Sequence, residues 1–231
     1  MVARQTIGGT RRLGLQFAIG MLLLILPMQA QAGVVGVGVT GKAGTTGLGG
    51  DLTIPIVSNF LNLRAGYNFG ELRPSVTEAG IKYKGDLHFE SIPILLDLHP
   101  FSGGFRITGG VFHNKNDMDL SSFLAAGSEI GGATTPVNTT LNANVSWSKE
   151  WAPYLGIGWG NAAEVDPDSS FSVGFSLDVG AFYQGSPDVF LTESTGLVPA
   201  SEIAAEQAQI EDDLSSFKFF PVLTLGIHIR F

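Results

Sequence analysis

Four histidines are the residues of this chain whose chemistry would most readily support catalysis or metal binding. His88, His99, His113 and His228 are scattered, and none has a serine or carboxylate partner at a recognisable spacing. A lone histidine is more often a satisfied hydrogen-bonding group. The chain has no cysteine, which excludes thiol catalysis, disulfides and zinc-thiolate sites. It has no phosphate-binding loop or nucleophile elbow either. We therefore expect a protein that is not an enzyme and that binds no metal ion and no cofactor.

A second set of residues could line a route for a solute, because charged side chains recur at the polar positions of alternating segments. They are Lys42, Asp51, Arg64, Asp97, Arg106, Asp178, Lys218, His228 and Arg230, with Glu90 and His99 nearer the segment ends. Inside a barrel these charges need partners or water, because an isolated buried charge is very costly. They form either a plug of paired charges or a polar track for a small zwitterion. Interior size favours the plug for most of the length.

The elements that would position these charges are strands, and the segment 217–231 shows the pattern most clearly. Its odd positions are all apolar and most of its even positions are polar or small. A period of two predicts a β-strand, because successive side chains point to opposite faces of a sheet. The segment is longer than most strands of soluble proteins and suits a tilted membrane crossing.

Seven earlier segments alternate in the same way, which gives eight predicted strands. They span residues 33–46, 48–57, 61–69, 85–99, 105–112, 145–161 and 171–184. Residues 41–47, at the first boundary, fit either a tight hairpin or a flexed continuous strand. The predicted fold class is all-β, an eight-stranded antiparallel transmembrane β-barrel, since a spanning sheet must close on itself in lipid.

The faces of this barrel are assigned by side-chain size. A soluble barrel of the lipocalin kind would bury its apolar residues inside, and alternation alone does not distinguish it from a membrane barrel. Here the polar face is crowded with glycine and small residues, which suits a narrow eight-stranded interior, and the bulky aromatics share the other face. The apolar face is therefore predicted to contact lipid.

The loops predict the orientation of the barrel. Short connections occur near residues 58, 100 and 165, whereas 71–84, 114–144 and 185–216 are long and polar. In outer-membrane barrels the short turns are periplasmic and the long loops extracellular. In the last loop, Ser201 could cap a short helix with Ile203, Gln207, Ile210 and Leu214 on one side.

The other side of this predicted helix is acidic. Its residues are Glu202, Glu206, Glu211, Asp212 and Asp213. They could concentrate cations at the mouth of the barrel, meet divalent ions of the lipopolysaccharide layer, or simply form a solvated helix face.

Aromatic residues predict where the membrane surfaces lie. Trp147 and Trp159, about twelve residues apart on one predicted strand, match two aromatic girdles when the strand is tilted by about 45°. Tyr183, at the end of the next predicted strand, is assigned to the same lipid interface.

The amino-terminus reads as a secretory signal peptide, and the chain divides into residues 1–32 and a barrel domain of residues 33–231. Three arginines precede an apolar run and the small-residue pattern Ala30-Gln31-Ala32. Without residues 1–32, ten basic and twenty-one acidic residues remain, a net charge of −11. This acidic domain has no basic patch for nucleic acid.

Several motifs resemble the CarO-type ornithine-uptake porins and their outer-membrane relatives. They lie at 43–50, 63–68, 99–101, 152–156 and 184–189, together with the acidic helix before the last strand. The resemblance covers nearly the whole mature chain. It implies a monomeric eight-stranded outer-membrane barrel, without an obvious wide channel, associated with uptake of small or basic amino acids and passage of some carbapenems. The final Phe231 also resembles the terminal aromatic residue that the barrel insertion machinery reads.

Two functions remain open from the sequence. One is a narrow porin-like route through the outer membrane of a Gram-negative cell envelope for small solutes such as basic or zwitterionic amino acids. The alternative is a closed structural or adhesion barrel that acts through its extracellular loops. The expected partners are outer-membrane lipid, lipopolysaccharide and the insertion machinery, with small amino acids under the first function.

Overall fold

The computed structural model describes residues 36–78, 81–164 and 171–231. The predicted signal peptide, residues 1–32, lies outside the described residues. Within the described part of the chain, no helix is both long enough and apolar enough to cross a membrane.

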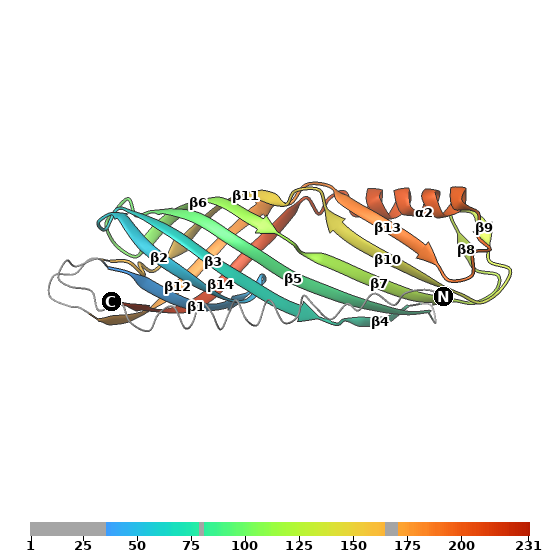
Figure 1. Ribbon diagram of the computed structural model, residues 1–231, viewed down its shortest axis with the longest axis horizontal. Coiled ribbons are helices and arrows are strands. Elements are labelled where there is room, and N and C mark those ends of the chain that lie inside the picture. The colour runs from blue at the N-terminus through green and yellow to red at the C-terminus, as the bar shows by residue number, and fades with distance from the viewer. Residues whose placement is uncertain (1–35, 79–80, 165–170) are drawn as a thin grey trace, which may run out of the picture.

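Eight antiparallel strands form a closed ring, which confirms the predicted barrel (Figure 1). Their order around the ring is β1 (Gly38–Gly44), β2 (Gly47–Val57), β3 (Leu61–Leu72), β5 (Ile81–Leu98), β6 (Phe105–Asn114), β11 (Trp151–Trp159), β12 (Ser172–Tyr183) and β14 (Phe219–Arg230). The ring closes where β1 pairs with β14, from Gly38 opposite Arg230 to Gly44 opposite Thr224. Residues 41–47 were predicted to form either a tight hairpin or a continuous strand. The structure has the tight hairpin, in which Gly47 has a φ of 89°.

Side chains alternate strictly between the two faces of the barrel wall. On β14, Leu223 and Leu225 are 51% and 65% exposed, whereas Val222 and Thr224 are each 4% exposed. The same alternation on β11 exposes Leu155, Ile157 and Trp159. The apolar face therefore points outward, as predicted, and the polar positions turn into the lumen.

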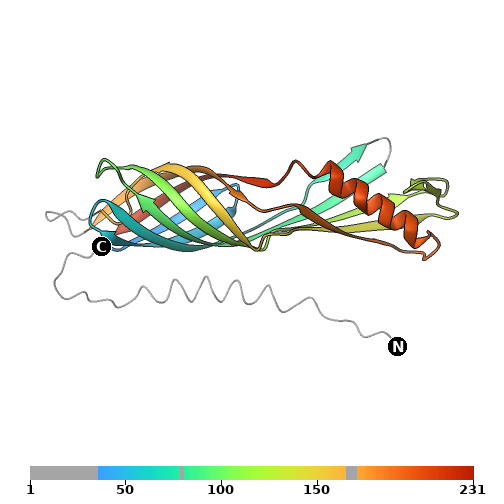
Figure 2. The ribbon, with the colours of Figure 1, turned by 90° about the horizontal axis from the view of Figure 1, so that it is seen from above.

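Beyond one end of the ring, a sheet extends the barrel, and this contradicts the prediction of polar loops at 114–144 and 185–216. We call it the extension sheet; Figure 2 shows it at the end opposite the C-terminus. Besides the start of β5, it contains β4 (Ser75–Glu78), β7 (Asp117–Leu124), β10 (Thr139–Trp147) and β13 (Pro187–Glu193). A small hairpin, β8 (Glu129–Ile130) and β9 (Ala133–Thr134), connects β7 to β10. Serine and asparagine on the solvent face hid the strand pattern of this region.

The prediction of one strand over 145–161 is also wrong. The chain leaves the extension sheet at Ser148 and enters the barrel as β11 at Trp151. At this bend the alternation changes phase, because Val145 is buried whereas Trp151 is 56% exposed. Trp147 and Trp159 therefore lie on separate strands, although odd positions are apolar in both.

The helix α2 (Ala200–Asp213) covers one face of the extension sheet (Figure 1). Ile203, Ile210 and Leu214 pack against a buried cluster formed by Ala143, Val145, Val189 and Leu191. This confirms the predicted apolar side of the helix. The opposite face of the sheet stays polar, because Asp119, Asn144 and their neighbours alternate with the residues that α2 covers.

Candidate functional site

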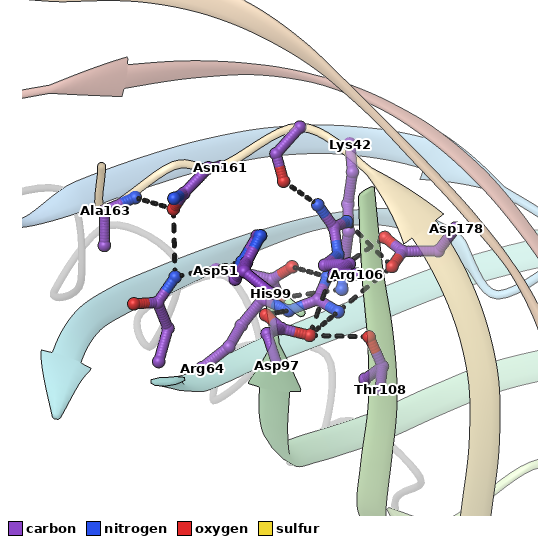
Figure 3. Close-up of polar contacts among 12 residues, drawn as sticks. Lys42, Asp51, Arg64, Asp97, His99, Arg106, Thr108, Asn161, Ala163 and Asp178 are labelled. Atoms are coloured by element: carbon purple, nitrogen blue, oxygen red, sulfur yellow. Dashed lines mark hydrogen bonds and ion pairs between the residues drawn. The ribbon is translucent and has the colours of Figure 1, made fainter. Parts of the chain in front are cut away.

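Six charged side chains meet inside the barrel, and we call them the charge network: Lys42, Asp51, Arg64, Asp97, Arg106 and Asp178 (Figure 3). All six were expected in the lumen from their strand positions. The side chains are no more than 7% exposed. Three are cations and three are anions, so the network is neutral.

Arg64 is the central member of the charge network. Its Nε lies 2.9 Å from Asp97 Oδ2, and its Nη1 lies 3.0 Å from Asp178 Oδ2 and 3.5 Å from Asp51 Oδ2. Lys42 Nζ completes the pairing of Asp51 at 2.7 Å. Because every charge has an opposite charge within 4 Å, the network offsets the desolvation that an unpaired charge would suffer.

Two threonine hydroxyls and Arg106 complete the coordination of the carboxylates. Thr108 Oγ1 donates to Asp97 Oδ1 at 2.6 Å, and Thr224 Oγ1 donates to Asp178 Oδ2 at 3.3 Å. Arg106 Nη2 donates to Asp178 Oδ1 at 2.8 Å, and its Nη1 donates to the carbonyl of Gly160. Connected polar networks of this kind rigidify a structure.

Glycines in the barrel wall leave the space that the charge network occupies. A Cβ atom on Gly66 would lie 1.9 Å from Asp51 Oδ1, and one on Gly158 would lie 2.8 Å from Arg106 Nε. Neither position could hold a larger residue without moving the network. The small residues of the predicted lumen face thus have a steric function.

Beside the charge network, towards the end that holds the C-terminus, lies a group of neutral hydrogen bonds. His99 Nδ1 lies 2.8 Å from the carbonyl oxygen of Gly103, so Nδ1 carries the proton and Nε2 can accept. Asn62 Nδ2 lies 3.2 Å from His99 Nε2 and 2.9 Å from Asn161 Oδ1. His99 is therefore a neutral hydrogen-bonding group in this arrangement.

On the other side of the charge network, towards the extension sheet, an apolar layer fills the lumen. This aromatic layer contains Leu95, Phe112, Ala152, Tyr154, Phe182, Phe220 and Val222. Phe182 stacks on Phe112 and on Phe220, each with 4.9 Å between ring centroids. This layer was not predicted, because its members occupy the positions assigned to a polar lumen. The sequence did hold a sign of this layer. Three large aromatic residues, Phe112, Phe182 and Phe220, occupy even positions of their strands, which are the positions predicted to face the lumen.

A cavity bordered by Thr53, Arg64, His99 and Arg106 has a volume of about 10 Å³. This volume holds about one water molecule.

The remaining predicted lumen residues lie outside the charge network. His228 and Arg230 are buried near the C-terminal end of β14, where Arg230 Nη1 lies 3.2 Å from Glu164 Oε2. Lys218 precedes β14 and is half-buried. Glu90 lies outside the lumen and approaches Lys115 Nζ at 3.4 Å.

Two of the predicted acidic residues of the helix accept hydrogen bonds from backbone amides of the β8–β9 hairpin and the extension sheet. Glu206 Oε2 accepts a hydrogen bond from Gly131 N at 2.9 Å, and Glu211 Oε1 accepts one from Val189 N at 3.2 Å. Asp212 and Asp213 are exposed, and Glu202 is half-buried.

The predicted interface aromatics lie in three different surroundings. Trp159 is 61% exposed on the outward face at the C-terminal end of the barrel. Tyr183 packs against Phe219 at the opposite rim, with 5.2 Å between ring centroids. Trp147 instead packs against the cluster under α2, and Trp151 takes an outward position near that rim. Phe231 is 53% exposed, and its backbone pairs with Val37.

One cluster of possible metal ligands lies on the polar face of the extension sheet. His88, Asp117 and Asp119 each offer a ligand atom, and these atoms all lie within 4.8 Å of one another. The cluster was not predicted, because His88 and Asp117 are 29 residues apart and only the pairing of β5 with β7 joins them.

Solved structures of outer-membrane proteins resemble most of this chain. The CarO2 protein of Acinetobacter baumannii aligns with a TM-score of 0.60 and 22% identity, over 87% of this chain and 100% of that chain. The CarO protein of the same organism aligns with a TM-score of 0.57 and 26% identity, over 86% of this chain and 99% of that chain. No protein-family model and no curated protein matches the chain.

Proposed function

We propose that the chain is a closed barrel of the bacterial outer membrane that presents the extension sheet and α2 at the cell surface, because it resembles the CarO and CarO2 proteins over most of its length. The observation that carries this proposal is the filled lumen. The charge network and the aromatic layer cross the interior one after the other, and the cavity beside Arg64 and Arg106 has a volume of about 10 Å³.

The size of this cavity argues against passage of a solute in this conformation. An amino acid is many times larger than one water molecule, so its passage would require the charge network to separate. Breaking one member of a buried ion pair costs about 3–5 kcal/mol, and Arg64 has three carboxylate partners.

Liposome swelling tests the proposal directly. The refolded mature protein in liposomes should give no swelling above protein-free liposomes with ornithine, glycine or glutamate. A single-channel recording should likewise show no steady conductance. Swelling with any of these solutes would contradict the closed barrel.

A second candidate is a narrow, gated route for basic or zwitterionic amino acids. The charge network favours it, because three cations and three anions could exchange partners with the ammonium and carboxylate groups of a solute. The double substitution Arg64→Met with Asp178→Leu should then abolish ornithine uptake while the barrel stays folded. Unchanged uptake by this variant would argue against a route through the network.

We further propose that the barrel is a monomer surrounded by outer-membrane lipid and lipopolysaccharide. Phe231 would carry the signal for the insertion machinery. A Phe231→Ala variant that assembles in the outer membrane at the normal rate would argue against this assignment.

A further inference from the structure

The polar face of the extension sheet carries a group of side chains that neither the barrel nor α2 uses. We propose that His88, Asp117 and Asp119 bind a divalent transition-metal ion of the Zn²⁺ class. The inference is independent of whether the lumen conducts.

Strand pairing places the three side chains on one face. His88 lies directly opposite Asp117 in the register of β5 and β7, and Asp119 is two residues further on, so it points to the same side of the sheet. His88 Nδ1 lies 3.2 Å from Asp117 Oδ2. Because all three ligand atoms lie within 4.8 Å of one another, small rotamer changes would bring them to the 2.0–2.2 Å that zinc requires.

The strands that carry these residues are held on both sides. β7 pairs with β5 on one side and with β10 on the other. Ligands on paired strands keep their geometry better than ligands on loops. The site is therefore positioned by the sheet before any ion binds.

The neighbouring side chains match the surroundings of a metal ligand. A metal-bound histidine usually donates its second ring N–H to a carboxylate. If His88 binds through Nδ1, its Nε2 lies 3.8 Å from Glu71 Oε1, which also pairs with Arg73 Nη2. Asp119 is oriented in turn by Asn144, whose Nδ2 donates to Asp119 Oδ1 at 2.9 Å.

Local charge also favours a cation. The register sets Asp86 opposite Asp119, and like charges in directly opposed positions destabilise a sheet. Arg73 Nε lies 3.3 Å from Asp86 Oδ1 and offsets that carboxylate. Asp117 and Asp119 lie beside His88, with Lys84 bordering the same groove as Asp119, and a divalent ion would balance the two carboxylates.

The donor set selects the class of ion. One imidazole nitrogen with two carboxylate oxygens suits Zn²⁺ and its transition-metal neighbours better than Mg²⁺ or Ca²⁺, which take oxygen ligands alone. Three protein ligands leave a fourth position for water, as in open zinc sites. Asp119 also borders a groove of about 320 Å³, so water can reach this position.

The test uses the untagged, refolded mature protein in detergent, titrated with ZnCl₂ in a calorimeter. We expect saturable binding of one ion per chain, and Co²⁺ at the same site should give visible absorption bands. His88→Ala and Asp119→Asn should each abolish saturable binding. Glu71→Gln should weaken it about 10- to 100-fold, as loss of an outer-shell partner does.

His113→Ala is the matched control, because His113 packs on Trp151, away from the cluster, with 4.8 Å between ring centroids. It should bind Zn²⁺ like the wild type. Gel mobility before and after heating would verify that each variant forms the barrel. The proposal is overturned if the folded wild type shows no saturable binding, or if folded His88→Ala binds as tightly as the wild type.

Discussion

Arg64 and Asp178 face each other across the width of the barrel and are joined by two hydrogen bonds of 3.0 Å. β3 and β12, which carry them, are four strands apart in the ring of eight and therefore lie on opposite walls. The pair ties the two walls together through the middle of the lumen.

Arg64→Ala should lower the free energy of unfolding by about 3–5 kcal/mol, because it leaves buried carboxylates without their shared partner. Urea unfolding of the protein in detergent micelles would measure the loss. Arg73→Ala is the control, since the Arg73 side chain is 63% exposed and exposed ion pairs contribute about 1 kcal/mol or less. Equal effects of the two substitutions would show that the charge network does not hold the walls together.

Gly66→Ala should destabilise the barrel by about 1–3 kcal/mol, the usual cost of forcing extra atoms into a packed interior. The added methyl group would collide with Asp51. Gly109→Ala provides a matched control on a neighbouring wall, because a Cβ atom there meets no other atom within 4 Å. Thermal unfolding, followed by gel mobility, should show a lower unfolding temperature for Gly66→Ala than for Gly109→Ala.

Phe182→Ala should cost about 3–5 kcal/mol, because it leaves a cavity in the aromatic layer. Phe182 is fully buried between Phe112 and Phe220. Phe190→Ala, at a side chain that is 67% exposed on the extension sheet, should change the unfolding free energy by less than about 1 kcal/mol. Urea unfolding would measure the free energy of unfolding of both variants. An unchanged value for Phe182→Ala would mean that the layer is loosely packed.

Glu193 should titrate unusually low. The Thr195 hydroxyl and amide donate to its carboxylate and lower its pKa from 4.5 to about 2. A depressed folded-state pKa contributes stability that is present above pH 4.5 and is lost as the pH falls towards 2. Carboxyl carbon NMR would give the midpoint, and Thr195→Val should move it up towards 4.5. An unchanged midpoint in this variant would contradict the assigned cause.

The sequence alone determined the barrel and the six charged residues that meet in its lumen. Period-two alternation fixes which face of each strand is apolar, and this gave eight strands and all six members of the charge network. The pattern is local, so it can be read from the sequence without knowing which strands pair. The apolar side of α2 was readable for the same reason, from the spacing of Ile203, Ile210 and Leu214.

The pairing of strands was decided only by the tertiary structure. Alternation does not record a change of phase, so the bend at Ser148 and the separate strands of Trp147 and Trp159 stayed hidden. Similarly, His88 meets Asp117, and Arg64 meets Asp178, through registers that join residues distant in the chain. Packing alone showed that the lumen contains an aromatic layer as well as charges, because a ring can fill a narrow interior as readily as it can contact lipid.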